Sequence, residues 1–269
     1  MADEPFRVHG EALLRSRVVR TKTPAVQLEA EFRRREAVLR QTFRRYVSPR
    51  VADKILEDPQ LLDTMLSTAD VRTHAVVLFA DLRGFTSISE QLEPHCVVPL
   101  LNEFFSLLTE ITFRHEGTVF HMAGDCLMVG FGVPLVQADS PERAVRAARE
   151  MLTSFGALTR SWNERYQIEA GLGIGISEGD VVAGNIGSAS YMNYTIIGDT
   201  VNIAARLCKR ARAGEILFSG VLKHSLDAHG LDIGATPLPP LKLRGRSHPI
   251  DIYCVPLESR MQSAGSVSP

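Results

Sequence analysis

Residues 75–86 read AVVLFADLRGFT, and this stretch decides the fold that we predict. Its first six residues form a continuous apolar run, which is typical of a strand buried in a protein core. Asp81 follows that run directly, and Gly84 provides for a turn a few residues later. The stretch therefore predicts a buried strand that ends beside an acidic side chain.

The pattern after this strand predicts alternating helices and strands. Apolar spacing indicates helices at 94–115 and 140–166, and short apolar runs indicate strands at 118–122, 126–131 and 168–176. Gly124 and Asp125 separate the second strand from the third, so these two strands are expected to form a hairpin. The order β-α-β-β-α-β is typical of an α+β fold of ferredoxin-like type, with an antiparallel-rich sheet flanked by helices.

The C-terminal half of the domain has a mixed pattern. We expect extended segments at 181–186 and 194–197, helices at 199–211 and 220–228, and strands at 215–218, 231–233, 241–243 and 250–255. The strand at 168–176 has glycine at positions 171, 173 and 175, on one face. Such a face lets another backbone or a ligand approach closely.

The chain is expected to have four parts. Residues 1–24 show no clear period, and 25–57 form a helical stalk whose apolar stripe either packs on its own domain or pairs with a second copy. Within it, Ser48 and Pro49 begin a short helix that ends before Asp58 and Pro59. The main domain covers 73–257, and the polar tail 258–269 is predicted to be disordered.

Composition and charge exclude several classes of protein. The formal net charge is −1, so a nucleic-acid partner is not expected. The apolar runs are too short for a transmembrane segment, and the polar start of the chain is not a cleavable signal peptide. The four cysteines lack metal-ligand spacing, which favours reduced thiols and a cytoplasmic location.

Two aspartates are candidates for a metal site. Asp81 and Asp125 lie at the ends of strands that are neighbours in a ferredoxin-like sheet. Two convergent carboxylates suit Mg²⁺, which prefers oxygen ligands and also binds substrate phosphates. The turn at Gly84, Phe85 and Thr86 offers backbone N–H groups as a phosphate cradle beside them. From spacing alone, Asp81 can also cap a helix and Asp125 can serve only its turn.

A second candidate pair lies in residues 194–206, YTIIGDTVNIAAR. Asn202 and Arg206 are four residues apart on one helix face, so their side chains lie together. An amide beside a guanidinium can orient a sugar and neutralise a phosphate. A pair of this kind is also common on a solvated helix face, and that alternative stays open here.

Three motifs together resemble one known family. They are FADLRGFT at 79–86, AGD at 123–125 and the segment 194–206, and they occur in the order and spacing of the class III adenylyl and guanylyl cyclase family. The resemblance covers about residues 74–255 and is closest to the bacterial type. Residues 43–49, FRRYVSP, also resemble the stretch that precedes bacterial cyclase domains.

The resemblance implies a role for each matched residue. Asp81, Asp125 and the backbone of Leu82 match the metal site, which takes two Mg²⁺ or Mn²⁺ ions. Phe85 and Thr86 match the phosphate-binding turn, Arg246 a basic residue that binds the triphosphate, Asn202 the residue that orients the ribose, and Arg206 the residue that stabilises the transition state. In such enzymes one protomer of a homodimer supplies the metal ligands, and the other supplies the base-reading and transition-state residues.

The two positions that read the base depart from the common family pattern. His121 stands where adenylyl cyclases usually have lysine, and Thr195 stands where aspartate is usual. Threonine there resembles the bicarbonate-responsive subgroup. Both side chains can donate and accept hydrogen bonds, so the pair fits either purine, and Thr195 favours adenine. A strand histidine without any contact to the base is the other interpretation of His121.

The resemblance thus implies an enzyme that converts ATP into cyclic AMP and pyrophosphate. The ribose 3′-hydroxyl attacks the α-phosphate in this reaction, in sites shared across a homodimer. Two alternatives remain: a guanylate cyclase that uses GTP, and a catalytically silent dimeric module that binds nucleotide. The four residues Asp81, Asp125, Asn202 and Arg206 favour an active enzyme, because a binding module needs no transition-state residues.

Overall fold

The computed structural model describes residues 31, 33–34, 37–38, 49–58, 60, 70–188, 191–242 and 248–256. The chain divides into two units, 1–39 and 40–269, and the fold below belongs to the second unit. The predicted pairing helix, the N-terminal segment 1–24 and the tail from 258 lie wholly or mostly outside the described residues. The short helix predicted at Pro49 is present as α2, Pro49–Glu57, and buries Ala52 and Ile55.

The first half of the domain has the predicted β-α-β-β-α-β order. Its elements are β1 Val71–Arg83, α4 Phe85–Gln91, α5 Pro94–Arg114, β2 Thr118–Ala123, β3 Cys126–Phe131, α6 Ser140–Tyr166 and β4 Gly171–Ser188. The seven-residue helix α4 was not predicted. Strand β1 continues past Asp81 to Arg83, because Asp81 pairs with Cys126 on one side and with Gly173 on the other.

The second half extends this unit. Its elements are β5 Tyr191–Ile197, α7 Asp199–Arg210, β6 Glu215–Ser219, α8 Gly220–Ala228, β7 Thr236–Leu241 and β8 Ile250–Pro256. The strand predicted at 231–233 is wrong, since those residues are irregular. The sheet continues instead at β7, which shares only Leu241 with the strand expected at 241–243 and contains three prolines. Strand β7 lies at the edge of the sheet, where a missing N–H donor is tolerated.

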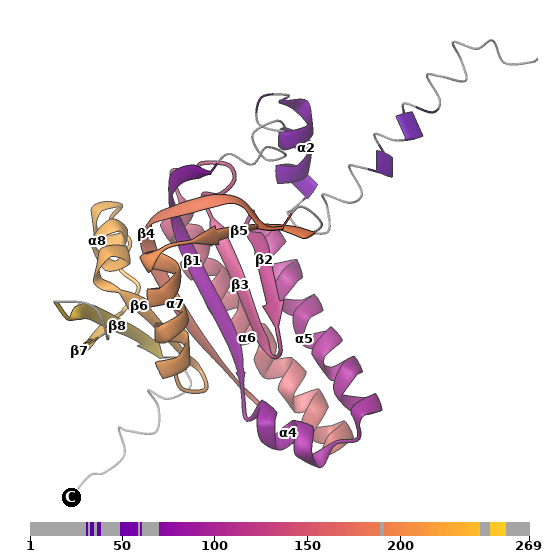
Figure 1. The fold of residues 1–269 in the computed structure, drawn as a ribbon. Helices are drawn as coiled ribbons and strands as arrows, with labels where there is room; N and C mark the ends of the chain where they lie inside the picture. Colours follow the sequence, from indigo (N-terminus) through magenta and orange to yellow (C-terminus); the bar gives the residue numbers. More distant parts are fainter. Residues whose placement is uncertain are drawn as a thin grey trace, which may run out of the picture. The chain divides into compact units, whose positions relative to one another are not determined.

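One eight-stranded sheet organises the domain (Figure 1). Its order is β2-β3-β1-β4-β6-β8-β7, and β5 pairs with β4 off this path. The pairs β1–β3, β1–β4 and β2–β3 are antiparallel, and β4–β6 is parallel. The central β2-β3-β1-β4 order is the ferredoxin-like arrangement that the element order predicts.

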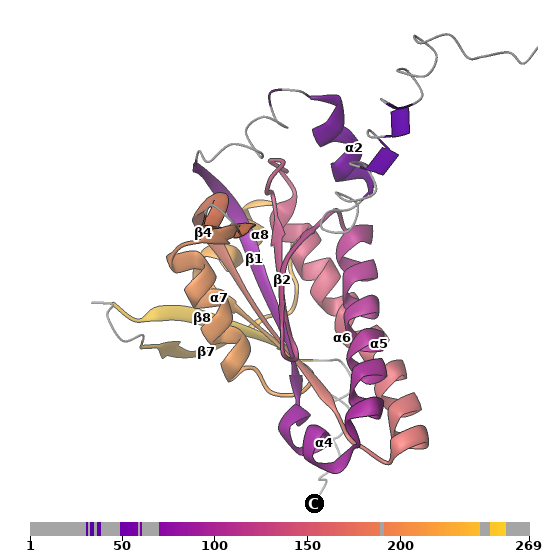
Figure 2. The same cartoon turned by 45° about the vertical axis from the view of Figure 1, so that its right-hand side comes forward.

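Helices cover both faces of the sheet. Figure 2 shows the sheet between α7 on one side and the pair α5 and α6 on the other. The larger core lies on the α5–α6 face and includes Phe104, Phe131 and Trp162, all fully buried. Two smaller cores lie on the α7 face, one of which includes Phe120 and Met128.

Helix α5 is long and apolar enough to cross a membrane by length and composition alone, and among the described helices it is the one that meets this test. Its Leu100, Phe104, Leu108 and Ile111 are buried in the larger core. These residues form the face of α5 that packs against the domain.

The alternating glycines of β4 let other groups approach the strand closely, as their spacing predicts. A Cβ atom at Gly175 would overlap the backbone nitrogen of Cys208, so the glycine lets α7 pack directly on the strand. A Cβ atom at Gly173 would lie 2.5 Å from Nη2 of Arg83. The glycine face of β4 thus admits one helix backbone and one guanidinium group.

Candidate active site

The two predicted metal-binding aspartates lie at neighbouring strand ends. Asp81 is in β1, opposite Cys126 of β3, and Asp125 precedes Cys126 in the hairpin turn. The backbone N–H of Leu82 donates a hydrogen bond to the carbonyl of Asp125 at 3.2 Å, which fixes the hairpin turn against β1. The structure therefore brings Asp81, Leu82 and Asp125 together, as the topology predicted.

The electrostatics of this pair suit a divalent cation. Burial and the neighbouring charge of Asp81 raise the pKa of Asp125 above its ordinary value. A cation beside such a carboxylate favours its ionised form. Within the described ranges no group of three or more His, Cys, Asp and Glu side chains could hold a metal. A metal here would thus take its other ligands from backbone, water or phosphate, as Mg²⁺ usually does.

Arg83 is a charged neighbour of Asp81 that the sequence did not single out as a site residue. Its Nη1 forms an ion pair with the Asp81 carboxylate. Its Nε donates to the carbonyl of Ala211 at 2.9 Å, and its Nη2 donates to the carbonyl of Cys208. The spacing of glycines at 171, 173 and 175 was the only signal that a bulky group would lie against β4.

The predicted phosphate cradle is the start of α4. Gly84 precedes this helix with a φ of 87°, a conformation that favours glycine. Phe85 and Thr86 form the first residues of the helix, directly after the end of β1. Their backbone N–H groups belong to the first turn, whose donors lack partners within a helix. The cradle therefore adjoins the two aspartates.

Asn202 and Arg206 lie on the outer face of α7. Both are exposed, whereas Ile203, Ala204 and Leu207 of the same helix are buried against the sheet. The backbone N–H of Asn202 donates to the carbonyl of Gly198 at 3.3 Å, in the first turn. In one chain, Asn202 and Arg206 therefore lie on a solvated helix face, which was the alternative interpretation of this pair. On that face both side chains can reach a ligand or a second copy of the chain.

The predicted base-reading residues flank a contact between two strands. His121 is exposed in β2, and Thr195 is half-buried in β5, opposite Gly184. The rings of their neighbours Phe120 and Tyr194 stack with centroids 6.1 Å apart. His121 and Thr195 therefore lie beside this contact, in two strands that do not pair with each other in the sheet. Arg246, the predicted triphosphate-binding residue, lies outside the described residues.

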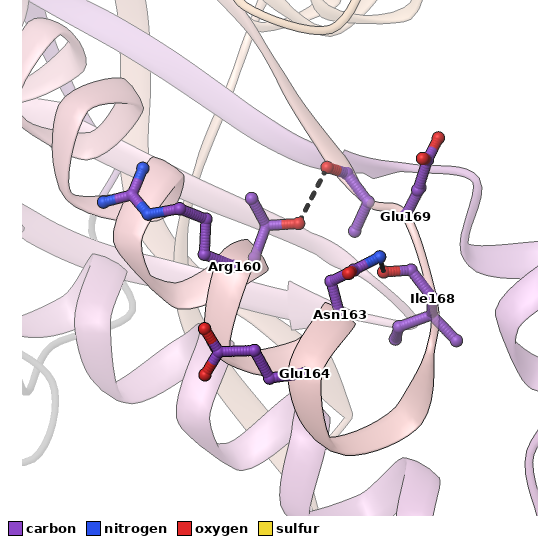
Figure 3. A pocket seen from close by; sticks show the side chains of 7 residues that line it. Arg160, Asn163, Glu164, Ile168 and Glu169 are labelled. Atoms are coloured by element: carbon purple, nitrogen blue, oxygen red, sulfur yellow. Dashed lines mark hydrogen bonds between the residues drawn. The ribbon is translucent and has the colours of Figure 1, made fainter.

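A pocket of about 370 Å³ lies elsewhere, between the C-terminal end of α6 and the start of β4 (Figure 3). Its lining includes Arg160, Glu164 and Glu169, and the Asn163 amide donates to the Ile168 carbonyl at 3.3 Å. None of the predicted site residues lines it. This pocket is therefore separate from the candidate active site.

Comparison with known proteins identifies the domain. Residues 69–256 match the model of the adenylate and guanylate cyclase catalytic domain. Adenylate cyclase 1 of Rhizobium meliloti is 32% identical over 188 residues, which are 68% of this chain and 27% of that protein. An uncharacterized protein of Mycobacterium tuberculosis is 38% identical over 140 residues, 52% of this chain and 25% of that protein. The matched region thus spans about a quarter of these curated relatives.

Solved cyclases have the same fold. The adenylyl cyclase CyaB from P. aeruginosa has a TM-score of 0.66 and 32% identity, covering 69% of this chain and 95% of that chain. The guanylyl cyclase Cya2 has a TM-score of 0.61 and 33% identity, covering 68% of this chain and 92% of that chain. The chain therefore belongs to the family of adenylate and guanylate cyclase catalytic domains and has the class III cyclase fold.

Proposed function

We propose that this protein is a nucleotide cyclase that converts ATP into cyclic AMP and pyrophosphate. The observation that carries the proposal is the convergence of Asp81 and Asp125 beside the first turn of α4, within a domain of the cyclase family. An adenylate cyclase and an adenylyl cyclase are among its relatives, which supports the choice of reaction.

The site residues have separate roles in the proposed reaction. The ribose 3′-hydroxyl loses its proton to solvent as its oxygen forms a bond to the α-phosphorus. The bond from that phosphorus to the oxygen that bridges it to the β-phosphorus breaks, and pyrophosphate leaves. Asp81, Asp125 and the Leu82 carbonyl would hold two Mg²⁺ or Mn²⁺ ions, which lower the pKa of the attacking hydroxyl and neutralise phosphate charge. The N–H groups of Phe85 and Thr86 bind phosphate oxygens.

Two exposed residues of α7 act on the sugar and the transition state. Asn202 orients the ribose so that its 3′-oxygen is in line with the α-phosphorus. Arg206 donates to the phosphate oxygens as negative charge develops on them, and Arg246 binds the triphosphate. Arg206 therefore contributes more to turnover than to nucleotide binding.

We further propose that the active enzyme is a homodimer whose sites are shared. The α7 face of the sheet supports this proposal, because Phe79, Tyr194 and Val201 are only partly covered there. Met122 at the end of β2 is 45% exposed, and Ile197 at the end of β5 is 49% exposed. A symmetric pair of chains would cover these apolar side chains and would bring Arg206 of one chain toward Asp81 of the other. The helix predicted at 26–46, within the stalk, would pair in parallel in the same dimer.

The preference for adenine rests on His121 and Thr195. A hydroxyl and an imidazole can each present a donor or an acceptor to the base edge. Thr195 also supports membership of the bicarbonate-responsive subgroup, with bicarbonate as a stimulating ligand. The similarity to the guanylyl cyclase Cya2 favours GTP as a second candidate substrate.

A product assay tests the proposal. The purified protein is given ATP or GTP with Mg²⁺ or Mn²⁺, and the cyclic products are separated by chromatography. Cyclic AMP in excess supports the adenylate cyclase, and cyclic GMP in excess keeps the mechanism but reverses the base assignment. Asp81→Ala should abolish either product, with Asp232→Ala in an exposed loop as the matched control. Wild-type protein that binds nucleotide without forming a cyclic product would refute the proposal.

A further inference from the structure

Arg83 contacts two elements that carry site residues. It forms an ion pair with Asp81 of β1, and it donates to the carbonyls of Cys208 and Ala211 at the C-terminal end of α7. All three nitrogens of its guanidinium group are thereby engaged. The Arg83 side chain is 23% exposed and that of Asp81 is 25% exposed, so water screens these bonds only in part.

The α7 carbonyls are natural acceptors for a cation. The last carbonyls of a helix lie at the negative end of its dipole. The Cys208 carbonyl accepts the backbone N–H of Ala211 at 3.1 Å, and a carbonyl oxygen can accept a second hydrogen bond. An arginine from another element can therefore cap the helix as well as bind a carboxylate. The planar guanidinium offers donors in several fixed directions, whereas a lysine ammonium offers a single point charge. The residue type at position 83 thus suits a link between three acceptors.

Gly173 leaves the space that the Arg83 guanidinium occupies. It opposes Asp81 in the β1–β4 register, and a Cβ atom there would lie 2.5 Å from Nη2 and 2.7 Å from Nε of Arg83. Such distances are too short for any side chain, so the guanidinium lies against bare backbone. The glycine and the arginine are two parts of one arrangement beside the Asp81 carboxylate.

We propose that Arg83 is a positioning residue that fixes the Asp81 carboxylate for metal binding by tying it to the C-terminal end of α7. The inference rests on the proposed function, because that function assigns a metal to Asp81. The two α7 carbonyls hold the guanidinium independently of Asp81, so the guanidinium can orient the carboxylate instead of following it. Groups that orient a metal-binding side chain in this way typically contribute about 10–100-fold to metal affinity or activity.

The link also sets the position of α7 relative to β1. Asn202 and Arg206 lie on the exposed face of this helix, so Arg83 connects the strand of the metal ligand with the helix of the sugar and transition-state residues. Loss of the link is therefore expected to affect metal binding first, and to leave a smaller loss of turnover at saturating metal.

Three variants test the proposal by different routes. Arg83→Met removes all donors, Arg83→Lys keeps the charge but not the fork, and Gly173→Ala keeps the arginine but displaces its guanidinium. Mn²⁺ binding is measured from the electron paramagnetic resonance signal of free Mn²⁺, and the half-saturating Mn²⁺ concentration is measured from cyclic product formation. For Arg83→Met, we expect the Mn²⁺ dissociation constant and the half-saturating Mn²⁺ concentration to rise about 10-fold or more. Gly173→Ala should raise both values, and Arg83→Lys should give values between those of wild type and Arg83→Met.

Arg149→Met is the matched control. Arg149 also donates to a backbone carbonyl, that of Ile233, at 2.6 Å, but it lies on α6, which packs on the opposite face of the sheet from α7. It should leave both metal constants unchanged. If Arg83→Met does not fold, as judged by circular dichroism, the other two variants decide the question.

The outcomes separate the two proposals. Wild-type protein that forms no cyclic product and binds no Mn²⁺ refutes the proposed function. Wild-type protein that is active, together with variants whose metal constants are unchanged, refutes the role of Arg83 alone. A lower Mn²⁺ dissociation constant in Arg83→Met would also refute the role of Arg83, since it would show that Arg83 competes with the metal for Asp81.

Discussion

At the scale of single residues, the candidate site is a small set of charges around the end of β1. Asp81, Asp125 and Arg83 together have one excess negative charge, and burial makes the proximity of the two carboxylates unfavourable. Burial and the charge of Asp81 therefore raise the pKa of Asp125. A bound divalent cation would reverse that effect, since an opposite charge favours the ionised carboxylate.

Replacement of Arg206 should separate turnover from binding. Arg206→Ala removes a donor that meets charge only in the transition state, so we expect kcat to fall about 100-fold or more while the nucleotide Kd changes little. Lys209→Ala, at an exposed position of the same helix, is the matched control. Steady-state kinetics and nucleotide binding are both measured, and an equal loss in the two would contradict the role of Arg206.

His74 predicts a pH-dependent part of the stability. Burial lowers the pKa of His74, but hydrogen bonds from its ring to Asp180 and Glu178, each 3.2 Å long, outweigh burial and raise that pKa above 6.5. The folded state therefore binds this proton more tightly than the unfolded state. Its contribution to the free energy of unfolding is complete below the unfolded pKa and is lost as the pH rises through the folded pKa.

The measurement compares wild type with His74→Gln in urea unfolding at about pH 5.5 and about pH 8. Wild type should be the more stable protein at the lower pH, and the difference should shrink at the higher pH. A difference that is equal at both pH values would show that the proton of His74 is not linked to folding.

At the scale of elements, the packing of α7 depends on glycine in β4. A Cβ atom at Gly175 would overlap the backbone of Cys208, and a helix backbone cannot move aside as a side-chain end can. Gly175→Ala should therefore lower the free energy of unfolding by about 2 kcal/mol or more. Thermal and urea unfolding measure this change.

Gly156→Ala is the opposite case in the same domain. Gly156 lies within α6, where a Cβ atom would meet only Nη1 of Arg160, at 3.9 Å. Alanine there should stabilise the protein by about 0.5–1 kcal/mol, because it loses less conformational entropy in a helix. Equal effects of the two substitutions would contradict the close packing of α7 on β4.

The elements that the sequence predicted well have strong periodic patterns. The apolar spacing of α5 and α6 gave their bounds within one residue, and the topology of the β2–β3 hairpin brought Asp125 to Asp81. Sequence spacing failed where distant partners decide the structure. Two strands were expected at 168–176 and 181–186, but β4 continues through Gly179 as one strand. The reason is that β1 pairs with β4 from Gly171 to Ala183. Arg83 was missed because its acceptors in α7 are more than 120 residues away.

At the scale of the whole molecule, the two faces of the sheet are covered by helices to different extents. Helices α5, α6 and α8 pack on one face. Helix α7 lies on the other, more open face, where Phe79 and Tyr194 are only half-buried. Figure 2 shows α7 on the opposite side of the sheet from α5 and α6. The metal residues adjoin α4, whereas Asn202 and Arg206 lie on the outside of α7. A second chain on the open face would combine the two groups.

Mixing of two impaired variants tests the shared site most directly. Asp81→Ala is expected to be inactive alone, and Arg206→Ala to keep about a hundredth of the wild-type rate or less. In a mixed dimer, one of the two sites would combine an intact metal pair from one chain with an intact arginine from the other. After equal mixing and subunit exchange, cyclic AMP formation should recover to about a quarter of the wild-type rate per chain. A mixture of folded, exchanging variants that stays as inactive as its components would contradict a site shared between two chains.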